Sequence, residues 1–243
     1  MSAMPARSML QGGIIAAGEG RRLLADGYSA SKPMVSVCGR PLIGHTLDRF
    51  RAVGIERLTV IINETSDDCH QWLRDHAADF DLTVIVRSTP SSYASFQLVV
   101  DRLARAPALV TTIDTVMPVE DFRRFVKTAA SFADDAVVLG VTDHVDDDNP
   151  LWAVIDSADG RITHLGGSSG SHVTAGLYWL PAKRPATSTV AFARLRDYLG
   201  WLVADRQPVY GVVLPRVFDI DRARDIAAAE LAELGLERVN TGA

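Results

Sequence analysis

The sequence has little cysteine and no long apolar run. Only Cys38 and Cys69 occur in 243 residues, with neither a disulfide framework nor metal-ligand spacing around them. No uninterrupted apolar stretch approaches the roughly 20 residues that a membrane-spanning helix requires. The first segment, residues 1–9, is short, and it is followed by a strand interrupted by glycine rather than by a signal-peptide core. We therefore expect residues 1–9 to be a frayed lead-in. These absences predict a soluble cytoplasmic protein that does not enter the membrane.

Excess charge is absent as well. The formal net charge is −5 and 23% of the residues are charged, which argues against general nucleic-acid binding while leaving room for a local basic pocket for phosphates. The length suits one large α/β domain, and we expect it over residues 10–243. Cys38 stands beside Gly39 in an expected turn, and we interpret it as a small packing residue. The sequence leaves the oligomeric state open, a homo-oligomer included.

Short apolar segments alternate with amphipathic ones along most of the chain. Strands this uniformly apolar are buried on both faces, and their alternation with helices predicts a mostly parallel sheet. Right-handed crossovers then give a doubly wound, three-layer α/β sandwich. We expect strands at 13–17, 58–62, 82–86, 108–113 and 136–141, and helices at 41–53, 67–78, 95–105 and 119–132.

The alternation changes after Val141. Two apolar segments separated by a polar turn predict a hairpin, and a further strand comes after it, so we interpret residues 142–185 as a small β-rich insertion within the single domain. A helix, a short strand and a closing helix complete the chain. The expected elements are a hairpin of 151–155 and 161–165, strands at 173–180 and 209–213, and helices at 187–204 and 222–234.

A glycine-containing loop comes directly after the first strand. Glycines at the carboxyl end of a buried strand let backbone N–H groups approach a polyphosphate, and ligands bind at this edge of open α/β sheets. A dinucleotide fingerprint needs a third glycine where Leu23 stands, and the Gly-Lys-Ser/Thr ending of a P-loop is absent. The glycines alone fit a ligand-free turn equally well.

Three motifs in order make the chain resemble the sugar-phosphate nucleotidyltransferases. Gly18-Glu-Gly-Arg-Arg-Leu23 is followed by Ser31-Lys-Pro-Met34 and Gly39-Arg-Pro-Leu-Ile43. The resemblance covers almost the whole chain and implies the Rossmann-like fold of the nucleotide-diphospho-sugar transferase type. It implies that Arg22 and Lys32 are the catalytic cations on the phosphates of a nucleoside triphosphate, a task that suits a guanidinium and an ammonium group. The implied nucleotide-binding loop consists of Ala16, Ala17, Gly18, Glu19 and Gly20.

Two aspartates resemble the metal ligands of that family. Asp114 comes after an expected strand where relatives carry Gly-Asp, and Asp221 belongs to a stretch similar to the closing motif of the family. Mg²⁺ is typically held by one or two carboxylates together with phosphate oxygens, so the resemblance implies a Mg²⁺ cofactor on Asp114 and Asp221. Asp219 would point the same way as Asp221 on a strand, which leaves the choice between them open. Asp225 is expected to stabilise the start of the closing helix.

Two further regions resemble ligand-contacting parts of the family. Ser92 and Ser95 lie in the region that contacts the base or the ribose. Val173-Thr-Ala-Gly-Leu-Tyr178 resembles a strand along the acceptor, which implies that Gly176 and Thr174 contact a phosphorylated acceptor, with Thr174 in place of the usual asparagine.

One motif of the family is missing. Many relatives carry a lysine for the acceptor phosphate just before this strand, but residues 165–172 contain none. Arg161, His164 or backbone amides of the glycine-serine turn would have to substitute, or the acceptor differs. The sequence therefore specifies neither the acceptor nor the base.

These observations predict a Mg²⁺-dependent nucleotidyltransferase. It would transfer a nucleoside monophosphate to a phosphorylated small-molecule acceptor of the sugar 1-phosphate type and release pyrophosphate. A molybdopterin nucleotidyltransferase and a phospho-alcohol cytidylyltransferase are alternatives within the same class. A regulatory module that binds nucleotides without turnover is the alternative outside it, and the two retained carboxylates speak against it.

Overall fold

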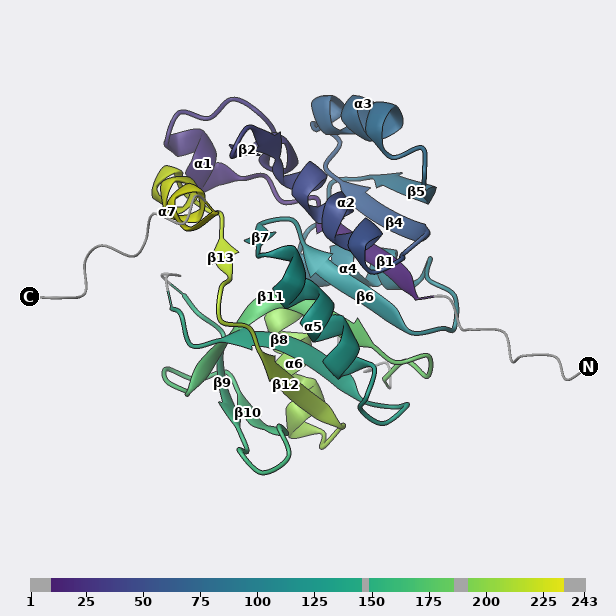
Figure 1. Ribbon diagram of the computed structural model, residues 1–243, viewed down its shortest axis with the longest axis vertical. Coiled ribbons are helices and arrows are strands. Elements are labelled where there is room, and N and C mark those ends of the chain that lie inside the picture. The colour runs from purple at the N-terminus through teal and green to yellow at the C-terminus, as the bar shows by residue number, and fades with distance from the viewer. Residues whose placement is uncertain (1–9, 146–148, 186–191, 234–243) are drawn as a thin grey trace, which may run out of the picture.

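The computed structural model describes residues 10–145, 149–185 and 192–233, so the expected lead-in at 1–9 lies outside the described residues. One large sheet dominates the fold (Figure 1). Its strands are β1 (Gln11–Ala16), β4 (Arg57–Ile62), β5 (Asp81–Val86), β6 (Ala108–Thr112), β8 (Val137–Thr142), β9 (Trp152–Ile155), β10 (Ile162–Leu165), β11 (His172–Leu180) and β12 (Val209–Val213).

The predicted α/β sandwich with a mostly parallel sheet is confirmed. The strand order is β10-β9-β11-β6-β1-β4-β5, with β8 paired to β11 and β12 paired to β8. Parallel pairing joins β6, β1, β4 and β5 in sequence, whereas β11 runs antiparallel to β6, β8 and β9. Of these nine described strands, only β10 and β11 oppose the common direction. The predicted hairpin is formed by β9 and β10.

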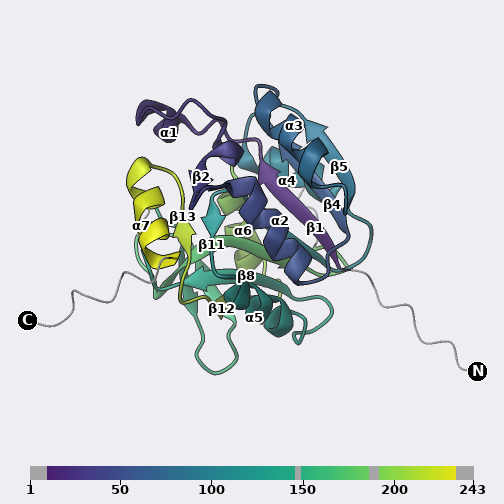
Figure 2. The same ribbon diagram turned by 45° about the horizontal axis from the view of Figure 1, so that its top comes forward.

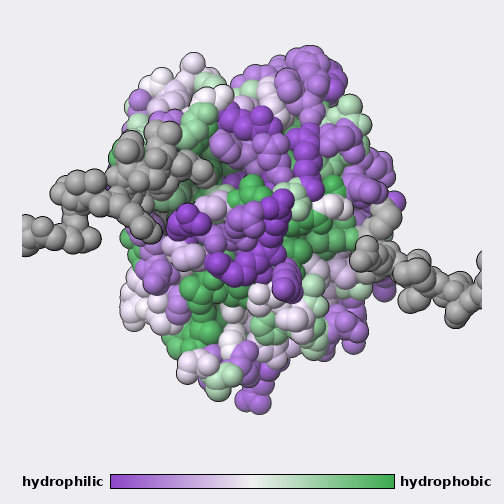
Figure 3. Space-filling view, viewed as in Figure 1, coloured by the Kyte–Doolittle hydropathy of each residue, from purple (hydrophilic) through white to green (hydrophobic). Residues whose placement is uncertain are grey.

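Helices cover both faces of the sheet and create two hydrophobic cores. α2 (Leu42–Ala52), α3 (Asp67–His76) and α5 (Val119–Ala129) pack on one face, and α4 (Ser92–Val100) and α6 (Leu195–Ala204) pack on the other. Figure 2 shows α2 and α5 lying along the strands of the first face. The outward side of α5 is hydrophilic in the middle of this face (Figure 3), as expected for a helix that buries one stripe. Among the described residues, no helix has the length and apolar character needed to span a membrane.

Two sequence predictions are wrong in detail. The strand predicted at 82–86 should be buried, but β5 stands at the end of the sheet and is partly exposed along its length, because it pairs with β4 alone among the described strands. The helix predicted at 187–204 begins at Leu195: residues 192–194 are not helical, and residues 186–191 lie outside the described part of the chain.

Short elements gather above one edge of the sheet. The first group is α1 (Arg21–Ala25), the 3₁₀ turn η1 (Lys32–Met34), β2 (Ser36–Val37) and β3 (Arg40–Pro41). The second group is β7 (Thr115–Val116), β13 (Phe218–Asp219) and α7 (Ala223–Glu233), with β13 antiparallel to β7. α1 and α7 lie side by side in Figures 1 and 2, and the Ala223 N–H donates to the Asp26 carboxylate at 3.0 Å. The segment that follows β1 and the C-terminal segment of the described chain therefore meet over this edge.

The two cysteines occupy opposite environments. Cys69 is fully buried on α3, and burial raises the pKa of its thiol to about 12. Cys38 is exposed in the turn between β2 and β3 with a φ of 49°. The interpretation of Cys38 as a packing residue is therefore wrong, because this left-handed turn points its side chain away from the core.

We expect the two thiols to react at very different rates with an aromatic disulfide reagent at pH 8. Only the thiolate attacks, so exposed Cys38 should react at once and Cys69 only after unfolding in denaturant. Counting thiols before and after denaturation checks this, and Cys38→Ser should abolish the fast phase. Equal rates for both thiols in the native protein would contradict the burial of Cys69.

Candidate active site

Chain segments from both halves of the protein converge at the carboxyl edge of the parallel strands. β1, β4, β6 and β8 all end there. β11 runs in the opposite direction, and its residue Leu177 pairs with Thr111 near the end of β6. The residues of β11 before Leu177 therefore extend past the end of β6, over the same edge.

The glycine-containing loop leaves β1 at this edge. Ala16 and Ala17 are buried, while Gly18 and Glu19 are exposed, so the backbone emerges from the core within two residues. The side-chain amide of Asn63, at the end of β4, donates to the Ala17 carbonyl at 3.1 Å and holds this exit. Gly20 has a φ of 64° and begins α1, and a Cβ there would lie 3.0 Å from the Cβ of Lys32. A glycine at this position thus permits both the left-handed turn and the close approach of Lys32.

Four residues predicted from separate motifs meet in one ionic cluster. The Lys32 ammonium lies 2.8 Å from an Asp114 carboxylate oxygen and 2.5 Å from an Asp221 oxygen. The second Asp221 oxygen accepts from Arg22 at 2.7 Å. Lys32 is only 8% exposed, whereas Arg22 is 42% exposed. The structure therefore brings Arg22, Lys32, Asp114 and Asp221 together, although 199 positions separate the first from the last.

The cluster is held in its ionised form. Burial by itself would lower the pKa of Lys32, but attraction to Asp114, Asp221 and Asp219 outweighs it and raises this pKa above the usual value. Burial would raise the pKa of Asp114, but the Lys32 ammonium and its hydrogen bond hold that pKa below the usual value. The raised pKa of Lys32 and the lowered pKa of Asp114 mean that this ammonium and this carboxylate are charged at neutral pH.

A third carboxylate completes an oxygen-rich group. Asp114, Asp219 and Asp221 each offer an oxygen, and these three atoms lie within 4.8 Å of one another. Three negative charges face the two positive charges of Lys32 and Arg22, which leaves an excess of one negative charge. Clustered carboxylate oxygens with excess negative charge are the donor set that Mg²⁺ prefers. Asp219 belongs to β13 and Asp221 lies just beyond it, so the shared strand face expected for them is not what brings them together.

Asp225 fixes the position of Asp221. Its carboxylate accepts hydrogen bonds from the backbone N–H groups of Asp221 at 2.9 Å and Arg222 at 2.7 Å. These bonds satisfy donors at the start of α7. Asp225 therefore stabilises the start of the closing helix as predicted, with direct hydrogen bonds and not only a favourable field.

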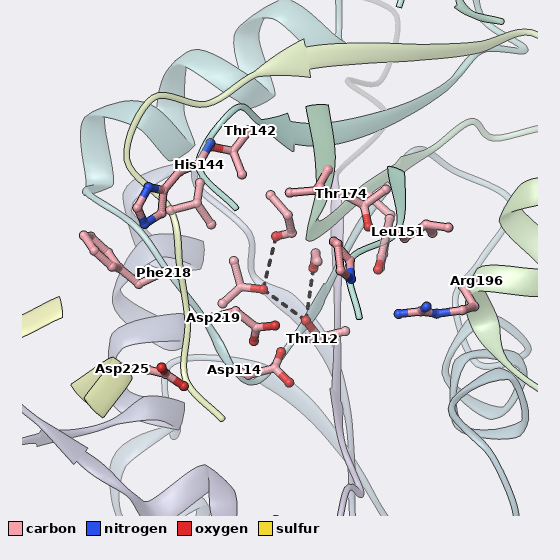
Figure 4. Close-up of a pocket in the computed structure, with 17 residues that line it drawn as sticks. Thr112, Asp114, Thr142, His144, Leu151, Thr174, Arg196, Phe218, Asp219 and Asp225 are labelled. Atoms are coloured by element: carbon pink, nitrogen blue, oxygen red, sulfur yellow. Dashed lines mark hydrogen bonds between the residues drawn. The ribbon is translucent and has the colours of Figure 1, made fainter. Parts of the chain in front are cut away.

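A cavity of about 200 Å³ opens beside the carboxylates (Figure 4). Thr174 and Gly176 line it, and Tyr178 forms part of its wall. The contact of Thr174 and Gly176 with an acceptor stays a prediction. Gly176 has a φ of 63°, and a Cβ there would collide with the hydroxyl groups of Thr112 and Thr115. The glycine is thus required by the packing of β11 against β6 and β7, whether or not a ligand lies beside it. The remaining lining residues are Thr112, Asp114, Thr115, Thr142, His144, Pro150, Leu151, Val173, Ala175, Arg196, Val217, Phe218, Asp219 and Asp225.

Both predicted base-contacting serines have structural partners. The Ser95 hydroxyl is buried and lies 2.6 Å from the Thr89 hydroxyl. The Ser92 hydroxyl accepts from the backbone N–H of Leu195 at the start of α6. The helix start is capped instead by Ser91, which accepts from Ala94. Neither Ser92 nor Ser95 lines the cavity, and their contact with a nucleotide stays a prediction.

The substitutes considered for the missing acceptor lysine are also elsewhere. Arg161, just before β10, donates to the main-chain carbonyls of Arg206 and Gln207, at 3.3 and 3.4 Å. These carbonyls precede β12, which begins at the opposite edge of the sheet. His164 is exposed on β10 and does not line the cavity. The cation that does line it is Arg196, in the first turn of α6. Sequence reasoning missed Arg196 because it belongs to no motif, and only the packing of α6 brings it to this edge.

Solved structures share this fold over almost its whole length. An inositol-1-phosphate CTP transferase from T. maritima superimposes with a TM-score of 0.75 at 18% identity, covering 96% of this chain and 99% of that one. A Bacillus anthracis chain described as a glucose-1-phosphate thymidylyltransferase, in complex with a sucrose, superimposes with a TM-score of 0.76 at 16% identity, covering 96% and 98%.

Sequence comparison identifies the family. A CMP-5'-(3-aminopropyl)phosphonate synthase from Streptomyces rubellomurinus is 28% identical over 103 residues, which are 42% of this chain but only 15% of that protein. The family of MobA-like NTP transferase domains matches residues 12–212, which begin within β1, include the glycine-containing loop and extend into β12. This chain therefore belongs to the family of MobA-like NTP transferase domains and is a nucleotidyltransferase, as the sequence predicted.

Proposed function

We propose that this protein transfers a nucleoside monophosphate from a nucleoside triphosphate to a phosphorylated small molecule of the sugar 1-phosphate type, and that Mg²⁺ assists the reaction. The observation that carries the proposal is the ionic cluster of Arg22, Lys32, Asp114 and Asp221 beside the glycine-containing loop and the cavity. The names of the two structural neighbours, an inositol-1-phosphate and a glucose-1-phosphate enzyme, agree with this acceptor class.

In the proposed reaction the acceptor needs no general base. One of its phosphate oxygens is already anionic and attacks the α-phosphorus in line, forming a new P–O bond. The bond from the α-phosphorus to the oxygen that bridges to the β-phosphate breaks, and pyrophosphate leaves with the electron pair. The protein contributes orientation and stabilisation of charge on the phosphate oxygens.

Each part of the site has one task in this scheme. Backbone N–H groups of Gly18 and Glu19 would hold the phosphates, because these two residues are exposed and leave room for them. Arg22 and Lys32 would neutralise the developing charge, and their existing ion pairs hold them close to it. Asp114 and Asp221 would hold Mg²⁺, which when bound neutralises charge on the phosphate oxygens.

A second candidate acceptor is a phosphonate. The relative from Streptomyces rubellomurinus is named for a CMP-phosphonate product. A phosphonate offers the same anionic oxygens to the α-phosphorus, so the mechanism is unchanged. The regulatory alternative without turnover fits less well, because a pure nucleotide binder has less need of clustered carboxylates beside its cavity.

A pyrophosphate-release screen tests the proposal. The nucleoside triphosphates CTP, UTP, GTP, ATP and dTTP are crossed with sugar 1-phosphates, inositol 1-phosphate, phosphocholine, molybdopterin and alkylphosphonates, with and without Mg²⁺. Release that needs one acceptor and Mg²⁺ supports a transferase of that acceptor. Tight nucleotide binding by calorimetry without release from any pair would instead favour the regulatory module.

We expect Asp114→Asn to lower the rate of pyrophosphate release by about 10²- to 10³-fold, because the substitution removes the negative charge of a carboxylate that would hold Mg²⁺. The fold should persist, because Lys32 keeps its ion pair with Asp221. Circular dichroism checks the fold, and Asp79→Asn, at an exposed ion pair with Arg51, is the control. Full activity in Asp114→Asn would refute the assignment.

A second pair of variants, Asp219→Asn and Asp221→Asn, decides which aspartate is the second metal ligand. The measurement is the Mg²⁺ concentration at half-maximal rate, and we expect the larger effect at Asp221.

Asp225 offers a separate prediction. Asp225→Ala removes both backbone hydrogen bonds at the start of α7 and should lower the free energy of unfolding by about 1 kcal/mol. Because Asp221 then loses its anchor, the Mg²⁺ concentration at half-maximal rate should rise as well. Ala227→Gly, at an exposed position of the same helix, should destabilise by about 1 kcal/mol without changing the Mg²⁺ requirement. An equal rise in both variants would show that Asp225 acts only through helix stability.

A further inference from the structure

We infer that Arg196 is the residue that binds the anionic group of the acceptor, in place of the lysine that the sequence lacks. This inference rests on the proposed function and makes it more specific. It assigns the acceptor to molecules with a tetrahedral oxyanion, a phosphomonoester or a phosphonate, because a planar guanidinium can bind two oxygens of such a group at once.

The first argument is position. Arg196 lies in the first turn of α6, on the face of the sheet opposite to α2 and α5. In Figure 4 its guanidinium group points into the cavity from the side opposite to Asp114 and Asp219. Thr174 of β11 and Leu151 also line the cavity and lie above Arg196 and the two aspartates in this view (Figure 4). The phosphate of an acceptor in the cavity would thus lie between Arg196 on one side and the carboxylates with the nucleotide on the other, so that Arg196 binds two of its oxygens while a third faces the α-phosphorus.

The second argument is charge. Among the described residues that line the cavity, Asp114, Asp219 and Asp225 are carboxylates, and Arg196 is the one side chain with a fixed positive charge. An anionic acceptor is repelled by the carboxylates and by the triphosphate, so its binding needs a cation within the cavity. Lys32 and Arg22 are already engaged with Asp114 and Asp221 on the nucleotide side.

The third argument is the way Arg196 is held. One terminal nitrogen donates to the Asn149 side-chain oxygen at 3.2 Å, and the other donates to the Asn149 main-chain oxygen at 2.8 Å. Asn149 is neutral, so these two bonds orient the guanidinium without cancelling its charge. A guanidinium group has five N–H donors, which leaves donors available for an oxyanion.

Tyr178 connects the two ends of the cavity. Burial raises the pKa of its hydroxyl group, the charges of Asp114 and Asp219 raise it further, and the charge of Arg196 acts in the opposite direction. The Tyr178 hydroxyl is therefore within electrostatic range of both ends. It stays protonated at neutral pH and adds a neutral hydrogen-bond donor to the wall along which the acceptor would lie.

Direct anion binding tests the inference without turnover. The protein is saturated with the α,β-methylene analogue of the nucleotide that binds tightest, and inorganic phosphate and methylphosphonate are titrated in by calorimetry. We expect Arg196→Gln to weaken binding of both anions roughly 10- to 100-fold, the range for a hydrogen-bonded charge, and Arg196→Lys to weaken it less. Arg161→Gln, which removes the cation that lies away from the cavity, should bind like the wild type. Affinities within twofold of the wild type in Arg196→Gln would overturn the inference, and stronger binding of one anion identifies the acceptor class.

Steady-state kinetics separates this inference from the proposed function. With an acceptor found in the screen, Arg196→Gln should raise the KM for the acceptor and leave the KM for the nucleotide unchanged. An equal rise in both would show a general defect and count against the inference, and thermal unfolding of each variant shows whether it folds. If the wild type releases no pyrophosphate with any pair, the proposed function fails. Loss of anion binding in Arg196→Gln would then still establish the site, and Arg196→Lys provides the same comparison should the glutamine variant not fold.

Discussion

The ion pairs of Lys32 with Asp114 and Asp221 are the interaction on which the rest of the site depends. They join the 3₁₀ turn after the glycine-containing loop, the end of β6 and the segment before α7. Three carboxylates within a few ångströms repel one another, and this repulsion grows as water is excluded. A buried ammonium between two of them makes that arrangement stable, whereas removing one partner of a buried pair is strongly destabilising. The closure of the fold over the carboxyl edge and the charge of the site therefore have the same cause.

The C-terminal segment adds two carboxylates to the one that follows β6. After β12 the chain crosses the edge of the sheet, pairs β13 with β7 and brings Asp219 and Asp221 to Asp114. Asp225 then holds the backbone of Asp221, and the first residue of α7 binds Asp26 after α1. The hydrogen bond between Ala223 and Asp26 joins residues that are 197 positions apart. A site assembled in this way exists only when the two ends of the domain are both in place.

Much of the fold and half of the site can be predicted from the sequence because local rules determine them. Apolar segments of β-branched residues form strands, but such a pattern does not say which strand is last in the sheet. β5 is partly exposed because it is the last strand. Asp114 could be found because a carboxylate directly after a buried strand must lie at the carboxyl edge. Ser92 and Ser95 fit a ligand site equally well by pattern, yet tertiary contacts with α6 and Thr89 use their hydroxyl groups. Arg196 has no local signal, since its place depends on how α6 packs behind β11.

This difference reflects how the two halves of the site are built. In the ionic cluster, Lys32 is the buried cation that pairs with carboxylates of two other chain segments, so the loss of Lys32 would leave both carboxylates without this partner. On the acceptor side, Arg196 is oriented by the neutral Asn149, and Gly176 is fixed by threonine hydroxyl groups. A change of acceptor contact there leaves no buried ion pair broken. In the proposed scheme, the nucleotide half is therefore constrained by the stability of the fold itself, whereas the acceptor half is constrained mainly by the ligand, and the motifs accordingly fall on the nucleotide half.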